Sequence, residues 1–281
     1  MNKGRWLALP ALGWLIGFFF VPLLFVVVIS LCSRGNYGEI LYQFTLENYR
    51  RFFEPLYINI LWDTIEMAAV TTALTFLLGY PLAYRIVRMN RSWQNVWLLM
   101  VMVPFWINFL IRSYAWVVIL RSQGLLNTFL ITAGFIDQPL NLLYNPAAVQ
   151  LGMVYTHLPF MVLPVYVSLE QLDRRLLEAS YDLGGTPWQT FRHVTLPLTL
   201  PGIVAGSILV FVSSLGMFVV PDIMGGAKSA LIGNLIQNQF LSARDWPFGS
   251  ALSILLTLFS LVLIFLYYRV VEAQKGKGGR Q

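Results

Sequence analysis

Residues with reactive side chains are few in this chain of 281 residues, which has two histidines and one cysteine. His157 and His193 lie outside any H-E-x-x-H pattern, so the sequence offers no zinc-hydrolase site. The stretch GGAKS (225–229) is similar to a phosphate-binding loop, but Ala227 stands where that motif needs a glycine before the lysine. We therefore predict no catalytic residue, no metal and no cofactor. His157, inside an apolar run, is expected to be a hydrogen-bonded packing residue.

A second group of side chains could attract a cation. Glu66 and Asp222 are carboxylates at the edges of apolar runs, and Trp106, Trp116 and Tyr49 are aromatic candidates. Carboxylates supply charge opposite to an ammonium group, and aromatic faces attract it through the ring quadrupole. On one continuous helix the two tryptophans would point about 80° apart, so they could flank one groove. The alternative, that these aromatic residues only anchor the helices, stays open.

The composition places these residues in a membrane. Hydrophobic residues make up 57% of the chain and charged residues 11%, whereas soluble domains average about 25% charged residues. A single all-α polytopic domain over 1–281 is expected. The first apolar run is about twice as long as the core of a signal peptide, so we expect an uncleaved span. Six runs are long enough to cross about 30 Å of hydrocarbon, near 6–32, 61–84, 96–120, 147–169, 198–220 and 249–269.

The basic residues predict the orientation. With the N-terminus inside, twelve of the 19 Lys and Arg residues fall in inner segments, six in outer loops, and Arg112 lies within a span. Positive charge favours cytoplasmic loops, so both termini and the segment 170–197 are expected inside. The same distribution argues against nucleic acid as a partner. Arg112 is expected to have a structural role, with Glu66 as one possible partner. The outer segments 44–57 and 229–241 are predicted to be short amphipathic helices on the membrane surface.

The polar segment EASYDLGGTPWQTFRHVTLP (178–197) has the pattern of two helices separated by a glycine pair. Asp173 is a candidate N-cap, and Gly184 with Gly185 would end the first helix, because glycine accepts the left-handed backbone. Pro197 is expected to mark the turn into the fifth span. Packing on its own helix bundle and docking on a cytoplasmic partner are both open for this hairpin. The second helix is predicted by a capping box with proline at its first position: Thr186, Pro187 and Gln189.

The same residues resemble the EAA loop of binding-protein-dependent ABC transporter permeases. That loop reads Glu-Ala-Ala, three residues, Gly, nine residues and Ile-x-Leu-Pro. Here it reads Glu178-Ala179-Ser180, then Gly184, then Val194-Thr195-Leu196-Pro197, with Ser180 and Val194 as mild departures. Longer stretches are similar to the polyamine (spermidine/putrescine) subgroup: VPFWINFLIRSYAW (103–116), MGGAKSALIGNLIQNQFL (224–241) and ARDWPFGSALS (243–253).

The resemblance implies a type I ABC importer permease with six transmembrane helices in a bacterial inner membrane. It implies a coupling loop that docks on a dimer of ATP-binding subunits through Glu178, Ala179, Ser180 and Gly184. Further implied partners are a second homologous permease, a periplasmic polyamine-binding protein and membrane lipid. The substrate path would involve Trp106, Trp116, Tyr49, Glu66 and Asp222. Two rivals remain: the same machine with another substrate, and an ion-coupled secondary transporter, which needs no docking loop.

Overall fold

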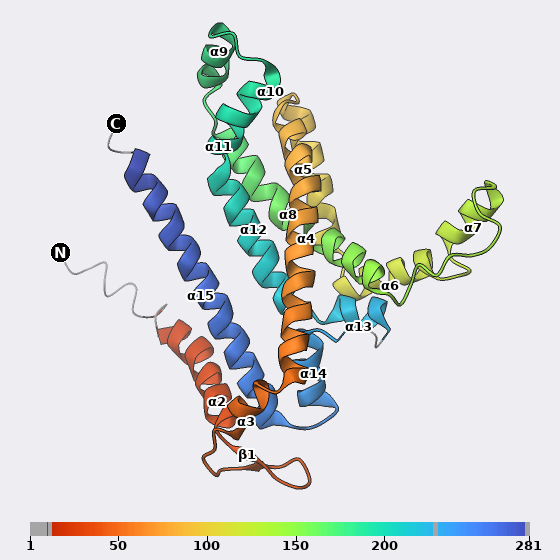
Figure 1. Cartoon of the computed structure of the whole chain (residues 1–281), viewed down its shortest axis with the longest axis vertical. Helices are drawn as coiled ribbons and strands as arrows, with labels where there is room; N and C mark the ends of the chain where they lie inside the picture. Colours follow the sequence, from red (N-terminus) through yellow and green to blue (C-terminus); the bar gives the residue numbers. More distant parts are fainter. Residues whose placement is uncertain (1–9, 11–12, 227–229, 279–281) are drawn as a thin grey trace. The chain divides into compact units, whose positions relative to one another are not determined.

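The computed structural model describes residue 10 and residues 13–226 and 230–278, which are mostly helical (Figure 1). A bent pair of helices, Pro187–Leu198 and Leu200–Leu215, raises the number of candidate spans to as many as six. The predicted helical polytopic fold is confirmed by these candidate spans. Residues 227–229 of GGAKS lie outside the described residues. Within the described residues, five helices are individually long and apolar enough to cross a membrane: Gly13–Ser30, Pro55–Val87, Phe109–Thr132, Pro146–Glu170 and Trp246–Leu266.

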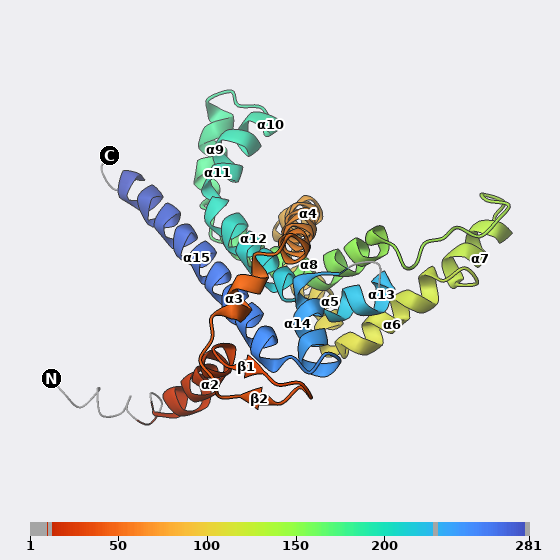
Figure 2. The ribbon, with the colours of Figure 1, turned by 60° about the horizontal axis from the view of Figure 1, so that its bottom comes forward.

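Contacts divide the chain into two units, Met1–Leu61 with Ile232–Phe265, and Trp62–Leu231 with Leu266–Gln281. The single domain expected over 1–281 stays a prediction. The first unit includes an antiparallel strand pair, which the all-helical expectation did not contain (Figure 2). Its helices α3 and α14 bear out the helical character predicted for 44–57 and 229–241. The elements of this unit are η1 (Ile16–Phe20), α2 (Val21–Ser30), β1 (Ser33–Arg34), β2 (Ile40–Leu41), α3 (Glu47–Phe52), the start of α4 (Pro55–Val87), α14 (Ile232–Leu241) and most of α15 (Trp246–Gly278).

A buried carboxylate organises the first unit. Asp245 is 1% exposed and accepts a hydrogen bond of 2.9 Å from Arg51 Nη1, while Arg34 Nη1 lies 3.7 Å away. Asp245 also caps α15 by accepting from the Phe248 amide at 3.2 Å. Burial alone would lower the pKa of the Arg51 guanidinium, but the hydrogen bond and charge of Asp245, helped by Tyr57, outweigh it and raise that pKa. The apolar core beside it consists of Phe52, Ile232, Phe248 and Leu252.

The second unit is built around α8 (Pro146–Glu170), which packs on α12 and α13. Small residues permit this close approach: a Cβ added at Gly152 would lie 2.6 Å from Met224 Sδ and 2.7 Å from Val220 Cγ1. Membrane helices commonly approach through such residues, since lipid provides no hydrophobic drive for association. The remaining elements are most of α4, α5 (Arg91–Trp106), α6 (Phe109–Leu120), α7 (Leu125–Thr132), α9 (Arg174–Asp182), α10 (Pro187–Thr190), η2 (Phe191–Thr195), α11 (Leu196–Leu198), α12 (Leu200–Leu215) and α13 (Val219–Gly225).

The boundary predicted for the third span, 96–120, is wrong. The helix is broken at Ile107, whose backbone is extended, and α6 starts after Asn108, whose side chain accepts from the Leu110 amide at 2.9 Å. A helix that ends leaves its last carbonyls without intrahelical donors. Arg112 Nη1 donates to one of them, the Pro104 oxygen, at 2.9 Å. Arg112 therefore has the structural role expected of it, but across the break rather than with Glu66.

The fifth span also differs from its predicted bounds of 198–220. The bend lies at Thr199 rather than at Pro197, and the helices on either side of it meet at 63°. The chain passes Pro197 without a turn because η2 is a π-helical segment, in which the Leu196 amide donates to the Phe191 oxygen. After the bend, α12 ends at Leu215, and α13 forms a separate short helix that carries Asp222.

Candidate functional site

The glycine-linked hairpin has the local structure that the sequence predicts. The Asp173 side chain accepts from the Arg175 amide at 2.9 Å and begins α9. Gly184 follows α9 with φ of 81°, a left-handed conformation that glycine adopts without steric cost. The capping box of α10 is complete, since the Gln189 amide donates to Thr186 Oγ1 at 3.3 Å and the Thr186 amide to Gln189 Oε1 at 2.8 Å.

One side of the hairpin packs on the spans. Phe191 meets the rings of Tyr80 and Tyr84 on α4 edge to face, with centroids 5.8 Å apart in each case. Thr195 is buried as well. Trp188 stacks on Phe191 at 5.6 Å but is 66% exposed, so the aromatic side of the hairpin is only partly buried. The aromatic contacts fix the hairpin to α4, and the two alternatives, packing and docking, are compatible.

The opposite side leaves apolar side chains uncovered. Leu183 is 89% exposed and Leu176 47% exposed. They border a shallow concavity of about 430 Å³ that Ala179 and Ser180 also line. At Gly184, no described residue other than its two chain neighbours has an atom within 4 Å of where a Cβ would stand. Clustered exposed apolar side chains of this kind mark protein interaction sites.

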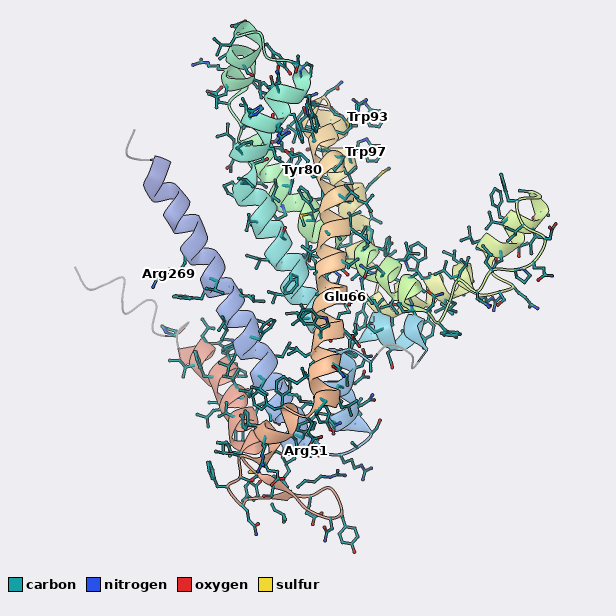
Figure 3. All side chains as sticks on the ribbon, in the orientation of Figure 1. Arg51, Glu66, Tyr80, Trp93, Trp97 and Arg269 are labelled. Carbon is teal, nitrogen blue, oxygen red and sulfur yellow. The ribbon has the colours of Figure 1, made fainter. Side chains whose placement is uncertain are left out.

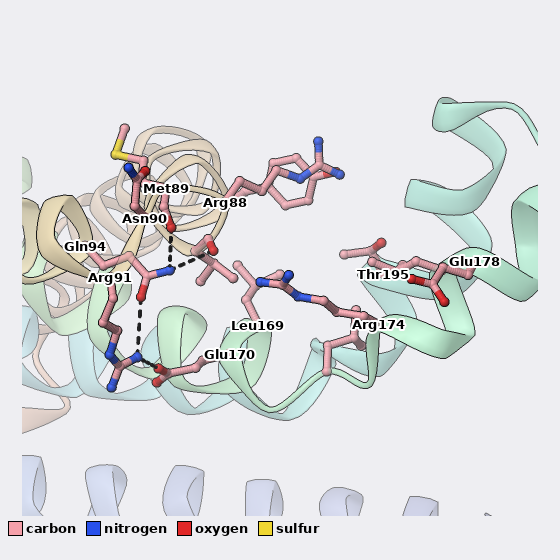
Figure 4. Close-up of a pocket in the computed structure, with 14 residues that line it drawn as sticks. Arg88, Met89, Asn90, Arg91, Gln94, Leu169, Glu170, Arg174, Glu178 and Thr195 are labelled. Carbon is pink, nitrogen blue, oxygen red and sulfur yellow. Dashed lines mark hydrogen bonds and ion pairs between the residues drawn. The ribbon is translucent and has the colours of Figure 1, made fainter.

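Glu178, the fourth predicted coupling residue, lies in a different cavity from Ala179 and Ser180. This cavity of about 720 Å³ is formed by the α4–α5 turn, the end of α8 and the start of α9 (Figure 4). Sequence reasoning did not find it, because its walls come from segments more than 70 residues apart. The available signal was Gln94, a polar residue two positions before the apolar run 96–120, which the structure shows to be buried in the first turn of α5.

The predicted cation-attracting residues do not form one cluster. Trp106 ends α5 and is 72% exposed, whereas Trp116 lies on α6 and packs edge to face on Tyr155 at 5.5 Å. The break at Ile107 places the tryptophans on two helices, so the 80° separation expected on one continuous helix does not apply, and the shared groove stays a prediction. Tyr49 belongs to the first unit, where its hydroxyl lies 2.7 Å from Ser30 Oγ.

Glu66 is the predicted residue that lines a pocket near other polar groups (Figure 3). This pocket of about 450 Å³ also contains Asp63, one turn earlier on α4, and Gln150 of α8. Gln150 Nε2 is held by Thr71 Oγ1 at 2.8 Å. The position of Gln150 inside the apolar run 147–169 was a signal in the sequence that the prediction did not use. Trp106, Trp116 and Asp222 do not line this pocket.

His157 is placed as expected for a packing residue. It is 1% exposed within α8, and its Nδ1 lies 2.8 Å from the Met153 oxygen. His193, in η2, makes the corresponding contact with the Gln189 oxygen at 3.0 Å. Both contacts bridge i and i+4 positions, so each ring serves the local helix.

The architecture and the sequence both match known transport proteins. Residues 75–276 match the family model described as binding-protein-dependent transport system inner membrane component. The chain belongs to this family. The permease is 45% identical over 257 residues to the spermidine/putrescine transport system permease protein PotB of Haemophilus influenzae, covering 92% of this chain and 90% of that one. The PotB of Escherichia coli strain K12 is 44% identical over the same length, covering 92% and 94%.

A solved structure supports the fold of the permease. The crystal structure of a bacterial ABC transporter that imports the acidic polysaccharide alginate superimposes with a TM-score of 0.74, covering 97% of both chains at 17% identity. At that identity the likeness concerns the fold alone. The family match and the fold together identify the chain as a membrane-spanning permease subunit of the ABC importer type.

Proposed function

We propose that this permease carries polyamines of the spermidine and putrescine type through the bacterial inner membrane as one half of a transmembrane pair. The observation that carries the proposal is the identity of 45% over 92% of the chain to a protein named as a spermidine/putrescine permease. In this assembly, ATP-binding subunits hydrolyse ATP to drive transport, and a periplasmic binding protein delivers the substrate. The partner permease is a homologous chain.

The hairpin supports a coupling role within this proposal. Ala179 and Ser180 are small where a partner's backbone would approach, and Leu183 offers exposed apolar area for docking. The aromatic contacts of Phe191 connect the hairpin to α4, so a movement of the hairpin by the ATPase would be transmitted to this span. We therefore assign ATPase coupling to Glu178, Ala179, Ser180 and Gly184, in a loop on the cytoplasmic side together with both termini.

The acidic pocket supports a passing cation. Asp63 and Glu66 place two carboxylates on one wall, while Met67, Val70 and Leu231 supply apolar surface. A polyamine needs both, because its ammonium groups are joined by methylene chains. Exposed Trp106 remains a candidate for contact with the substrate through its ring face. We also assign Trp116, Tyr49 and Asp222 to the substrate path.

Uptake into proteoliposomes tests the function. The four-component importer should accumulate radiolabelled spermidine only when loaded binding protein faces the outer surface and ATP is available to the ATPase subunits. Dissipating proton and sodium gradients should leave uptake unchanged. Uptake that needs a gradient and ignores ATP would establish the secondary transporter instead. A binding protein that ignores polyamines but drives uptake of another solute would leave the machine intact and replace its substrate.

A further inference from the structure

The cavity that contains Glu178 has an arrangement of arginines that the coupling role does not explain. Three of them line it: Arg88 and Arg91 from the α4–α5 turn, and Arg174 from the first turn of α9. Gln94 makes the turn rigid, because its Nε2 donates to the Val87 and Met89 oxygens at 2.9 Å each. The backbone that carries Arg88 and Arg91 is therefore held in place by these hydrogen bonds.

Only one of the three arginines has an acidic partner among the described residues. Arg91 is ion-paired with Glu170 at the end of α8. The Arg88 guanidinium lies over the Tyr84 ring, 4.1 Å from its centroid, and Arg174 points from α9 toward the turn (Figure 4). Stacking on an aromatic ring orients a guanidinium while leaving its in-plane N–H donors free for another group.

The wall of the cavity is apolar beside these donors. Its hydrophobic members come from the turn, the end of α8 and α9: Val87, Met89, Leu169, Leu172 and Leu177. A small inorganic anion would use the guanidinium groups and gain nothing from this wall. A ligand with an anionic head joined to an apolar body would use both.

Two tryptophans indicate that this end of the unit lies at a membrane interface. Trp93 and Trp97 follow Arg91 on α5, one helical turn apart, and are 58% and 38% exposed (Figure 3). Tryptophan is enriched at the level of the lipid headgroups, where its ring is partly wet. Basic pockets between transmembrane helices on the cytoplasmic side bind phospholipid headgroups.

We propose that this cavity binds the phosphodiester headgroup of a membrane phospholipid, with Arg88 and Arg174 as the phosphate-contacting residues. The glycerol and the first methylenes of the lipid lie along the leucine side of the cavity. The site rests on the proposed function only for its location in the inner leaflet. Because Glu178 lines the same cavity, a bound lipid would contact the hairpin on the side away from the exposed Leu183.

Lipid retention by the assembled importer tests this site. We compare the double variant Arg88→Gln/Arg174→Gln with the control Arg85→Gln/Arg175→Gln, which removes the same charge at neighbouring exposed positions outside the cavity. Complexes are delipidated in detergent and titrated with phosphatidylglycerol, phosphatidylethanolamine or phosphatidylcholine, all of which carry the phosphodiester, and bound lipid is measured by native mass spectrometry. Loss of charge-assisted bonds should lower lipid affinity about tenfold or more in the first variant only.

Three outcomes would overturn the proposal. One is equal lipid retention by both double variants. Another is displacement of the lipid by inorganic phosphate at comparable concentration, which would make the ligand a soluble anion. A third is an ATPase subunit that cross-links to a photoreactive residue at position 174 while the assembled importer holds no lipid. Arg174→Lys should retain most binding, because lysine keeps a point charge for phosphate, whereas Arg88→Lys should weaken it, because lysine loses the planar stack on Tyr84.

The lipid measurement is independent of transport. If the glutamine pair fails to assemble, Arg174→Gln alone carries the test, because that side chain is exposed. Retained lipid specificity in a complex that transports no polyamine would contradict the proposed function and leave this site standing. Normal polyamine uptake, with lipid binding that does not depend on Arg88 and Arg174, would contradict the lipid site and leave the proposed function standing.

Discussion

At the scale of single residues, the polar side chains of the spans divide into those that complete the fold and those that remain open to a ligand. Arg112 belongs to the first kind, because it donates to the Pro104 oxygen at the break between α5 and α6. Glu66 belongs to the second, since its carboxylate faces a pocket with Asp63. Polar residues of either kind are costly in a span, so their partners distinguish structural from functional roles.

Trp106 allows the substrate path to be tested at one position. If its ring meets the passing cation, Trp106→Leu removes a quadrupole attraction of about 0.5–2 kcal/mol. That corresponds to a roughly two- to thirty-fold loss in a binding step. Trp106→Phe should keep much of the uptake because it retains an aromatic face. The measurement is spermidine uptake per assembled complex, together with ATPase activity stimulated by loaded binding protein.

The comparison of leucine with phenylalanine separates recognition from packing. Trp106 is 72% exposed, so neither change removes much contact within the chain. Equal uptake by the two variants, after correction for the amount of complex, would remove Trp106 from the substrate path. The pocket of Asp63 and Glu66 would then be the remaining local support for a cationic substrate.

At the scale of secondary-structure elements, the hairpin could be predicted because its determinants are adjacent in sequence. Asp173, Thr186 and Gln189 make their capping bonds within three residues, and Gly184 supplies its own backbone freedom. Cap preferences depend on local backbone donors, so they hold with little help from tertiary structure. The start of α9, its end before Gly184 and the start of α10 were therefore predicted correctly.

Gly184→Asp should uncouple the hairpin from its partner. The change adds bulk and an unpaired charge in a docking contact, which costs about 2–5 kcal/mol if the contact is buried. Uptake and co-purification of the ATPase subunits should fall, while insertion into the membrane continues. Pull-down of the ATPase subunits from detergent-solubilised membranes gives the readout.

Two variants control this experiment. Gly184→Asn has nearly the size of aspartate and tolerates the left-handed backbone, but it adds no charge. Gly134→Asp places the same residue at another open glycine, with φ of 74°, after α7. If Gly184→Asp binds the ATPase and transports as well as Gly134→Asp does, the docking assignment fails.

The break in the predicted third span could not be seen from hydropathy. The run 96–120 is almost continuously apolar, and its interruption depends on Asn108 as a cap and on Arg112, which binds back across the break. Pro104 and Asn108 together were the local warning, because both favour helix ends or turns. The cavity of Arg88 and Arg174 was out of reach for another reason: it exists only after α4, α8 and α9 are brought together.

At the scale of the whole molecule, the assignment to the inner membrane and the coupling role depend on one orientation. The distribution of basic residues predicts that residues 170–197 are inside, and the hairpin within them is the proposed ATPase contact. The loop between β1 and β2 would then be outside. The structure offers exposed positions on both segments, Leu183 at 89% and Tyr37 at 94% exposed, so single cysteines can report their location.

In a Cys32→Ser background and in cells that lack the ATP-binding subunits, which would cover Leu183, Leu183→Cys should react with a membrane-impermeant maleimide only after spheroplasts are broken. Tyr37→Cys should react in intact spheroplasts. Serine suits position 32, because the buried Cys32 thiol donates to the Val28 oxygen at 3.3 Å and a hydroxyl can do the same. Leu183 is preferred to Gln189 as a reporter, since replacing Gln189 would break the capping box of α10. Labelling is read as a mass shift of the purified permease. A Leu183→Cys protein that reacts in intact spheroplasts would invert the topology, and the hairpin could not then meet a cytoplasmic ATPase.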